Sequence, residues 1–333
     1  MFTLPKNLSW RLSQTQWHCF LLGLLACFWI SACNGQTLFA PSASNQSASQ
    51  ECQVVQHQLG ETCVPFEPQR IVATDEIALE ILLALDVKPV ASGEPNLVSS
   101  RSRHLADKVA GVESLGKEEQ LNLEKMVELK PDLILGFSVY SEYYPIFSQI
   151  APTVSLNYTH TGWKEELRQV ANILNKSEKA EQLLADYQVR ITAFQAAMGN
   201  RLTQTEVSVA RFYTGSQISE FRTRSSFPGS VLDDMGLARP ESQNQSVKPD
   251  QTYIDVSLER LDLLDGDVMF AAVDPGAEAS LKNFQKSPLW QTLKAVKNNR
   301  VYVVDSGYWI FGNILAANAI LDDLFRYLIE ESP

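Results

Sequence analysis

The chain has 333 residues, enough for two packed domains with their own cores. Hydrophobic residues make up 45% and charged residues 20%, as in ordinary soluble globular proteins. The formal net charge of -11 disfavours recognition of nucleic acid through a general basic surface, although it leaves room for a local basic pocket.

The N-terminus has the pattern of an export signal that ends in a lipidated cysteine. Lys6 and Arg11 precede an apolar run over residues 19–30 (CFLLGLLACFWI). As a helix this run would span about 18 Å, which is too short for a bilayer core and typical of a signal peptide. Because Ser31-Ala32-Cys33 resembles a bacterial lipobox, we expect a signal peptide over residues 1–32 and a lipid on Cys33. An ordinary export signal that happens to contain a cysteine is the alternative.

Residues 33–51 are predicted to form a flexible tether, because they are rich in Ser, Ala, Asn and Gln. Cys52 and Cys63 follow, and an even pair of cysteines in an exported chain indicates a disulfide. The alternatives are two free thiols, or a metal site that would include His57 but has no further ligands nearby in the sequence.

From residue 68 onward, short apolar runs alternate with segments of helical spacing. The first half contains predicted strands over 70–73, 90–93, 133–136 and 153–156, with predicted helices over 78–85, 123–129, 146–150 and 163–174. The second half contains predicted strands over 207–212, 268–273 and 301–304, with predicted helices over 229–235 and 314–329. This alternation predicts parallel sheets with helices on both faces.

A longer amphipathic segment over residues 177–198 separates the two halves. We expect it to be a helix that joins two lobes, with an N-terminal lobe over 52–174, a linking segment over 175–200 and a C-terminal lobe over 201–333. A long helix within one continuous domain is the alternative.

The two halves also repeat one pattern. Residues 122–136 (NLEKMVELKPDLILG) align in register with residues 257–271 (SLERLDLLDGDVMFA), which pairs Glu124 with Glu259. The repeat predicts a capped helix and a buried strand in each lobe. Each glutamate either interacts with its helix dipole or is an exposed carboxylate that docks onto a two-fold membrane partner.

The sequence lacks the usual signatures of catalysis. It contains no G-x-S-x-G, H-E-x-x-H, P-loop or G-x-G-x-x-G motif. The expected mature chain keeps only His57, His104 and His160, which are too scattered to predict a transition-metal cage. We therefore expect no enzyme, no cofactor and no direct metal ligands.

Cationic and aromatic residues follow several predicted strands, where ligands of parallel sheets bind. Guanidinium groups bind carboxylates with two hydrogen bonds, and aromatic faces cover the apolar arms of a chelator. The alternatives are core packing for each aromatic residue and a surface ion pair for each arginine. The candidate ligand-binding residues are Lys117, Tyr140, Arg211, Tyr213, Arg222 and Trp309.

Six segments, taken in order, resemble the iron-siderophore periplasmic binding proteins of ABC importers (ferric citrate, hydroxamate and cobalamin type). The resemblance covers about residues 68–328. The segments are PQRIVATDEIALEILLALDVKPVA, NLEKMVELKPDLIL, IFSQIAPTV, FPGSVLDDMGLARP, SLERLDLLDGDVMF and SPLWQTLKAVKNNRVYVVD. Residues 52–72 resemble the corresponding region of cyanobacterial members, which favours a cyanobacterial source.

This resemblance implies an α/β fold with two Rossmann-like lobes, each with a central parallel sheet, joined by one long helix. It implies a monomeric protein of the cell envelope, anchored to the membrane through lipid, that captures a ferric siderophore or ferric citrate. The partner would be an ABC permease dimer, onto which Glu124 and Glu259 would dock. Lys117, where relatives often carry Arg, and Tyr140 fall near positions that contact chelated iron in hydroxamate binders. Binding of cobalamin or haem on the same fold is the alternative.

Overall fold

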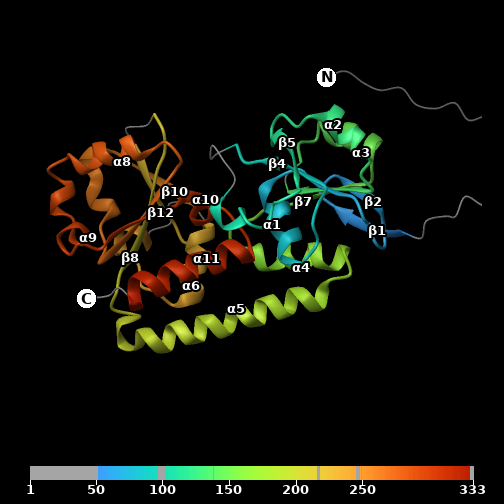
Figure 1. Ribbon diagram of the computed structural model, residues 1–333. Helices are drawn as coiled ribbons and strands as arrows, with labels where there is room; N and C mark the ends of the chain where they lie inside the picture. Colours follow the sequence, from blue (N-terminus) through green and yellow to red (C-terminus); the bar gives the residue numbers. More distant parts are fainter. Residues whose placement is uncertain are drawn as a thin grey trace, which may run out of the picture. The chain divides into compact units, whose positions relative to one another are not determined.

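The computed structural model describes residues 52–96, 102–137, 139–215, 218–244, 248 and 250–330. The predicted signal peptide, the tether and the lipidation site Cys33 lie outside the described residues. Within the described part of the chain, no helix is long and apolar enough to cross a membrane. Two five-stranded sheets form the centres of two lobes (Figure 1).

The sheet of the N-terminal lobe is parallel throughout, with the strand order β5-β4-β3-β6-β7. Its strands are β3 (Ile71–Ala73), β4 (Ala91–Glu94), β5 (Glu113–Lys117), β6 (Leu133–Phe137) and β7 (Thr153–Leu156). Its helices are α1 (Glu76–Ala84), α2 (Leu123–Glu128), α3 (Tyr144–Ile150) and α4 (Trp163–Ile173). Every residue of β3, β6 and β7 is buried, as expected for strands that are covered by helices on both faces.

The sheet of the C-terminal lobe is mixed, with the order β10-β9-β8-β11-β12. Its strands are β8 (Val207–Phe212), β9 (Ser219–Arg222), β10 (Tyr253–Val256), β11 (Val268–Val273) and β12 (Val301–Asp305). Strand β9 runs antiparallel to both β8 and β10, an arrangement that the sequence pattern did not predict. The helices of this lobe are α6 (Phe227–Met235), α7 (Glu241–Asn244), α8 (Glu278–Gln285), α9 (Lys294–Lys297), α10 (Ser306–Ile310) and α11 (Ile314–Phe325).

The long helix α5 (Ser177–Met198) follows α4 and leads to β8, and Figure 1 shows it running along one side of both lobes. Its buried positions recur every three or four residues and form one apolar stripe. The stripe consists of Ala180, Leu184, Tyr187, Ile191, Phe194 and Met198. It belongs to a hydrophobic core that includes Leu79 and Trp163 of the first lobe and Phe227 and Phe270 of the second, so the two lobes share one core.

A hairpin of β1 (Cys52–His57) and β2 (Gly60–Pro65) precedes the first lobe, and the predicted disulfide joins Cys52 to Cys63. The hairpin is fixed to β7 because Gln58 N donates to the carbonyl of Ser155 (3.0 Å) and Thr62 Oγ1 donates to that of Thr153 (2.8 Å).

The repeated segment differs between the lobes. In the first lobe, Asn122 accepts a hydrogen bond from Lys125 N and caps the α-helix α2. In the second lobe, the matching residues form the 3-10 helix η3 (Leu258–Leu264), with a non-helical backbone at Arg260 and no side-chain cap from Ser257. The prediction of a capped α-helix is therefore wrong for the second lobe, where the break at Arg260 leaves a 3-10 helix that still buries Leu261 and Leu264.

Candidate functional site

A cavity of about 220 Å³ lies where the two lobes meet. The first lobe contributes residues that follow its strands, and the second contributes the start of α10 and the residue that follows it. The lining comprises Asp75, Glu76, Ile77, Glu80, Pro95, Asn96, Glu118, Phe137, Tyr158, Ser306, Gly307 and Phe311. This place, beyond the carboxyl ends of parallel strands, is where open α/β sheets bind their ligands.

Aromatic rings connect the two lobes across this cavity. The ring of Tyr158 lies between Phe137, with 6.5 Å between ring centroids, and Phe311 of the second lobe, also at 6.5 Å. The ring of His160 packs on the opposite lobe's Phe311 at 5.5 Å. Together these rings form an apolar surface suited to the organic part of a ligand.

Arg222 lies next to Phe311 on the side of the second lobe. Its guanidinium carbon is 5.9 Å from the ring centroid of Phe311 and 5.6 Å from that of Tyr253, distances typical of cation–π contacts. The residue is only 2% exposed, its Nη1 atom donates to Glu220 (2.7 Å), and its Nε atom has no hydrogen-bond partner. An unpaired donor on a buried cation favours a further acceptor supplied by a ligand.

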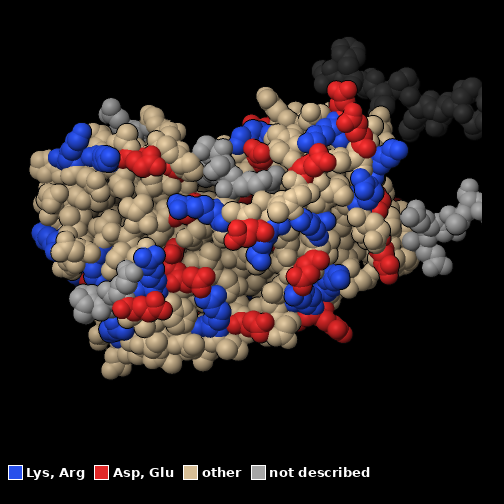
Figure 2. All heavy atoms as spheres, viewed as in Figure 1, with Lys and Arg blue, Asp and Glu red and all other residues tan. Residues whose placement is uncertain are grey.

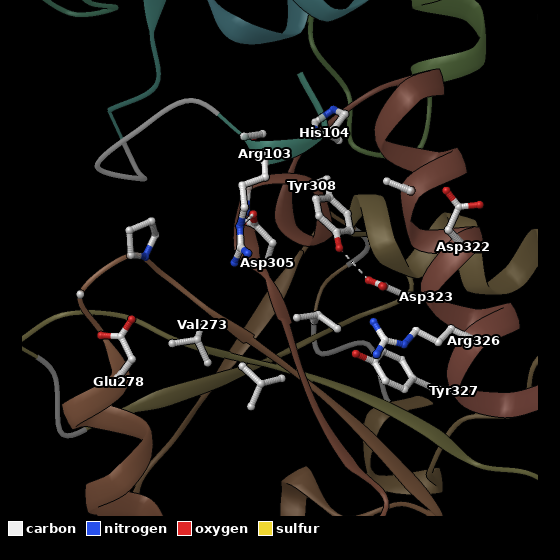
Figure 3. A pocket seen from close by; sticks show the side chains of 17 residues that line it. Arg103, His104, Val273, Glu278, Asp305, Tyr308, Asp322, Asp323, Arg326 and Tyr327 are labelled. Carbon is white, nitrogen blue, oxygen red and sulfur yellow. Dashed lines mark hydrogen bonds and ion pairs between the residues drawn. The ribbon is translucent and has the colours of Figure 1, made fainter. Parts of the chain in front are cut away.

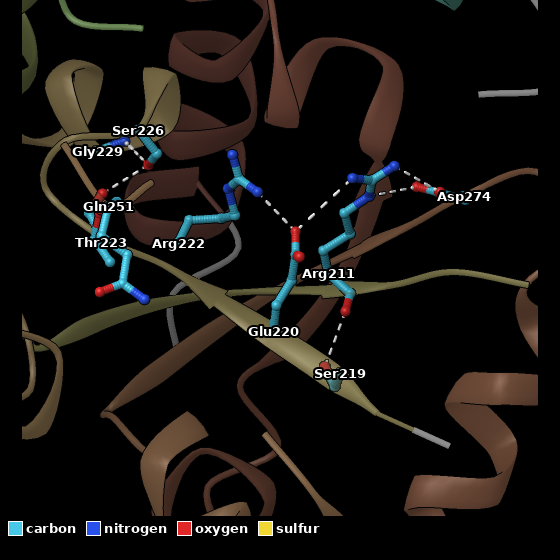
Figure 4. A network of polar contacts seen from close by, with 9 residues as sticks. All are labelled: Arg211, Ser219, Glu220, Arg222, Thr223, Ser226, Gly229, Gln251 and Asp274. Carbon is cyan, nitrogen blue, oxygen red and sulfur yellow. Dashed lines mark hydrogen bonds and ion pairs between the residues drawn. The ribbon is translucent and has the colours of Figure 1, made fainter. Parts of the chain in front are cut away.

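Arg211 joins Arg222 in one buried ionic network, which Figure 4 shows. Arg211 donates from Nε (3.0 Å) and Nη2 (2.8 Å) to Asp274, and its Nη1 atom lies 3.8 Å from Glu220. Its guanidinium carbon lies 5.7 Å from the ring centroid of Tyr213. The antiparallel pairing of β8 with β9 sets Arg211 opposite Glu220, which explains how a strand missed by sequence patterns positions both arginines.

The charge of Arg222 also affects the protonation of His160. Burial, and secondarily the charge of Arg222, lower the pKa of His160 to about 4. The imidazole is therefore neutral at neutral pH, and its Nδ1 atom is buried without a hydrogen-bond partner.

A second cavity of about 180 Å³ adjoins the first and shares Asp75, Asn96, Glu118 and Phe137 with it. Tyr140, which is half exposed, lines this second cavity with Tyr143. Lys117 does not line either cavity. Its Nζ atom donates to the carbonyl of Pro95 (2.9 Å) and lies 4.0 Å from Glu94.

Trp309 occupies a different position from the one expected for a ligand contact. Its side chain is fully buried, stacks on Phe270 with 4.6 Å between ring centroids, and donates from Nε1 to Asp323 (2.7 Å). The structure thus places Trp309 in the core, and Phe311 two residues later reaches the cavity instead. Sequence reasoning selected Trp309 and not Phe311, because a local pattern does not indicate which of two neighbouring rings faces the other lobe.

A larger cavity of about 830 Å³ lies beside the site and shares Gly307 with it (Figure 3). It is lined by charges of both signs, including Arg103, which pairs with Asp305 (2.8 Å), and Asp323, which accepts from Tyr308 (2.8 Å). We assign the candidate site to the 220 Å³ inter-lobe cavity, because Tyr158 and Phe311 of the aromatic bridge line it and Arg222 packs against the ring of Phe311.

Glu124 and Glu259 are both exposed, in the first turns of α2 and η3. A hydrogen bond from the Ser257 side chain lowers the pKa of Glu259, so this carboxylate is charged at neutral pH. Figure 2 shows acidic and basic side chains interspersed over the visible face, without one dominant patch. The described residues contain no group of three or more His, Cys, Asp or Glu side chains placed to hold a metal ion.

Residues 71–308 match the model of the periplasmic binding protein family. The chain belongs to this family. Its lobes and linking helix agree with the fold class expected from the sequence.

Similar members of the periplasmic binding protein family include two from Bacillus subtilis. The probable siderophore-binding lipoprotein YfiY is 34% identical, over 92% of this chain and 96% of the relative. The Fe(3+)-citrate-binding protein YfmC is 28% identical, over 91% and 94%. Among solved structures, Staphylococcus aureus SirA complexed with staphyloferrin B has a TM-score of 0.71 and 27% identity, and the match covers 83% of this chain and 98% of SirA. These relatives confirm the resemblance to siderophore-binding members, while the cyanobacterial source stays a prediction.

Proposed function

We propose that this protein binds a ferric siderophore or ferric citrate complex in the inter-lobe cavity and delivers it to an ABC permease. The observation that carries the proposal is the convergence of Arg222 and Phe311 of one lobe with Tyr158 and His160 of the other. Ferric complexes of carboxylate chelators are anionic, and a guanidinium group binds carboxylates well. The relatives named for siderophore and ferric citrate binding support the same ligand class.

In this proposal the protein carries out no covalent chemistry. Iron stays within its chelator, and the chain supplies cationic, aromatic and hydrogen-bonding contacts, while the ATPase of the importer supplies the energy. The lipid on Cys33 would hold the protein at the membrane, and Glu124 and Glu259 would contact one permease subunit each. Haem is a less favoured ligand, because no histidine is among the described residues that line the cavity. Cobalamin is less favoured, because the similar proteins are named for siderophore and ferric citrate binding.

The experiment that tests this function is fluorescence quenching of the protein without its N-terminal 50 residues. The panel would contain ferric citrate, a ferric hydroxycarboxylate siderophore, a ferric hydroxamate, a ferric catecholate, cobalamin and haem. We expect saturable quenching by a ferric complex and none by the same chelator without iron. Quenching by no ferric member of the panel would overturn the proposal.

Two variants localise the site. Arg222→Lys keeps the charge but loses the planar guanidinium, and Phe311→Ala removes the ring beside it, so each should weaken binding at least tenfold. Arg224→Gln is the matched control, because Arg224 has a side chain that is 57% exposed and pairs with Asp233 outside the cavity. Unchanged affinity in both site variants, with retained melting temperatures, would move the site elsewhere.

A further inference from the structure

The wall that the N-terminal lobe contributes to the inter-lobe cavity is acidic. Asp75, Glu76, Glu80 and Glu118 line it, and no Lys or Arg among the described residues does. Two of these carboxylates accept hydrogen bonds from backbone N–H groups of the fold. Asp75 accepts from Ala78 N (2.8 Å) and Phe137 N (2.6 Å), and Glu80 accepts from two backbone N–H groups of the other lobe.

One carboxylate oxygen of Glu76 accepts no hydrogen bond. Its Oε1 atom accepts from the backbone N–H (3.1 Å) and the hydroxyl of Ser102, whereas its Oε2 atom is buried without a hydrogen-bond partner. The residue is 9% exposed and lines the cavity. A buried carboxylate oxygen without a donor is unfavourable, so this wall is suited to a donor that arrives with the ligand.

Glu118 lies beside Glu76 and lines both cavities. Its Oε1 atom accepts a hydrogen bond from Glu76 N (3.0 Å). Burial, and then the charge of Asp75, raise the pKa of Glu118 to about 8, while Lys117 acts in the opposite direction. The acid therefore holds a proton at neutral pH that an incoming cation would displace.

The side of the cavity formed by the second lobe carries no acidic side chain among the described lining residues and adjoins a cation. Phe311 lines the cavity and carries Arg222 against its ring, with the Arg222 Nε atom unpaired. The first lobe thus offers acceptors to the cavity, and the second lobe offers the ring of Phe311, against which the cation Arg222 packs. An all-anionic ligand would match only one of these two sides.

We propose that the preferred chelate is amphoteric: an ammonium group of the chelator faces Glu76 and Glu118, while its carboxylates lie on the side of Phe311, within the field of Arg222. The inference rests on the proposed function and narrows its ligand class to hydroxycarboxylate chelators that carry a free amine. An ammonium group is a donor without acceptor capacity, so it pairs with the unused Oε2 atom of Glu76. Bound there, it also favours the charged form of Glu118.

The test compares three ferric complexes that share one iron-binding group. The probes are ferric citrate, the ferric complex of a citrate monoamide bearing a 2-aminoethyl arm, and the same complex with that amine acetylated. We expect the amine-bearing probe to bind at least tenfold more tightly than its acetylated form. Binding of the two arm-bearing probes with equal affinity would overturn this inference and leave the proposed function intact, whereas binding of none of the three would overturn both.

Two substitutions test whether the acidic wall causes the preference for the amine-bearing probe. Glu76→Gln and Glu118→Gln should each reduce the ratio of affinities between the amine-bearing and acetylated probes by about tenfold. Glu119→Gln is the control, because it removes the same charge from an exposed neighbour that does not line the inter-lobe cavity. A ratio that stays unchanged in both wall variants would overturn the assignment.

Calorimetry distinguishes a direct role of Glu118 in ligand binding from a merely structural one, because only the direct role changes the number of protons released on binding. Titrations at pH 7 in buffers of different ionisation enthalpy measure protons exchanged on binding. The amine-bearing probe should release about one proton from the wild-type protein and none from Glu118→Gln, since the glutamine has no proton to lose. Proton uptake, or equal release from both proteins, would contradict the proposed role of Glu118.

Discussion

The carboxylate of Glu80, in α1 of the first lobe, accepts a 3.0 Å hydrogen bond from the backbone N–H of Asn313, at the start of α11 in the second lobe. The same oxygen accepts from Ala316 N (2.8 Å), so Glu80 caps a helix that belongs to the other lobe. Asn313 is fully buried and donates from its side chain to the carbonyl of Trp163 (2.8 Å). Polar contacts as well as the shared core therefore hold the lobes together.

Replacing Glu80 by alanine should destabilise the whole protein. The substitution leaves two buried N–H groups without an acceptor, at a cost of about 1–3 kcal/mol for each. We expect the free energy of unfolding, measured by urea denaturation, to fall by roughly 2–4 kcal/mol. Glu128→Ala, at an exposed position of α2, is the control and should change it by less than about 0.5 kcal/mol. Equal losses in both variants would contradict the capping role.

The stability of the protein should fall as pH rises through neutrality. The pKa of Glu118 is about 8 in the folded protein against 4.5 for an unperturbed glutamate. Between these two values the folded state keeps a proton that the unfolded chain has released, so the free energy of unfolding decreases with pH. Glu118→Gln should flatten this slope in urea denaturation at pH 5, 6.5 and 8, while Glu119→Gln should not. Parallel curves for wild type and Glu118→Gln would rule out the raised pKa.

Opening the Cys52–Cys63 disulfide should weaken the attachment of the hairpin. The bridge closes a loop with a sequence separation of 11, for which the chain-entropy model gives about 3 kcal/mol. We expect dithiothreitol to lower the melting temperature of the wild-type protein to that of the Cys52→Ser/Cys63→Ser variant. The reductant should not change the melting temperature of the variant. A decrease in the melting temperature of the variant would show that the reductant acts on something other than this disulfide.

Charge reversal at the two exposed glutamates should separate transport from binding. The double variant Glu124→Lys/Glu259→Lys should bind the ferric ligand with unchanged affinity, because neither residue lines the cavity. Uptake of radioactive iron by cells that express it with the permease should fall at least tenfold. Glu128→Lys, which reverses an exposed charge on the same helix as Glu124, should leave uptake nearly normal. Normal uptake with the double variant would exclude these glutamates from docking.

Most of the parallel strands were predictable because each is a short apolar run with a helix after it, whereas the parallel strand β5 was not predicted, because its sequence ESLGK is largely polar and only Leu115 is buried. The residues of β6 and β11 are almost all buried, so their sequences must be apolar whatever lies beside them. Strand β9 was missed because its sequence, SEFR, contains two charged residues. These residues are buried only because Glu220 pairs with Arg211 and Arg222, and such pairing depends on contacts that no local pattern specifies.

Sequence reasoning selected only some of the residues that the structure brings to the candidate site. Residue type was enough to select Arg222, and residue type together with a position at the end of a predicted strand was enough to select Arg211. These two properties could not show that Trp309 faces the core while Phe311 faces the cavity, since both rings occur in one short segment. Glu118 was missed because its unusual proton affinity comes from burial beside Asp75, which is distant in the sequence.

The core shared by the lobes bears on how such proteins can diversify. Leu79, Trp163, Phe227 and Phe270 pack in one cluster although they come from both sides of α5. A chain that exchanged one lobe for that of a relative would have to refit these side chains to each other before any change of ligand could be selected. New specificities should thus arise by substitutions on the cavity walls, with the pairing of the lobes inherited as a unit.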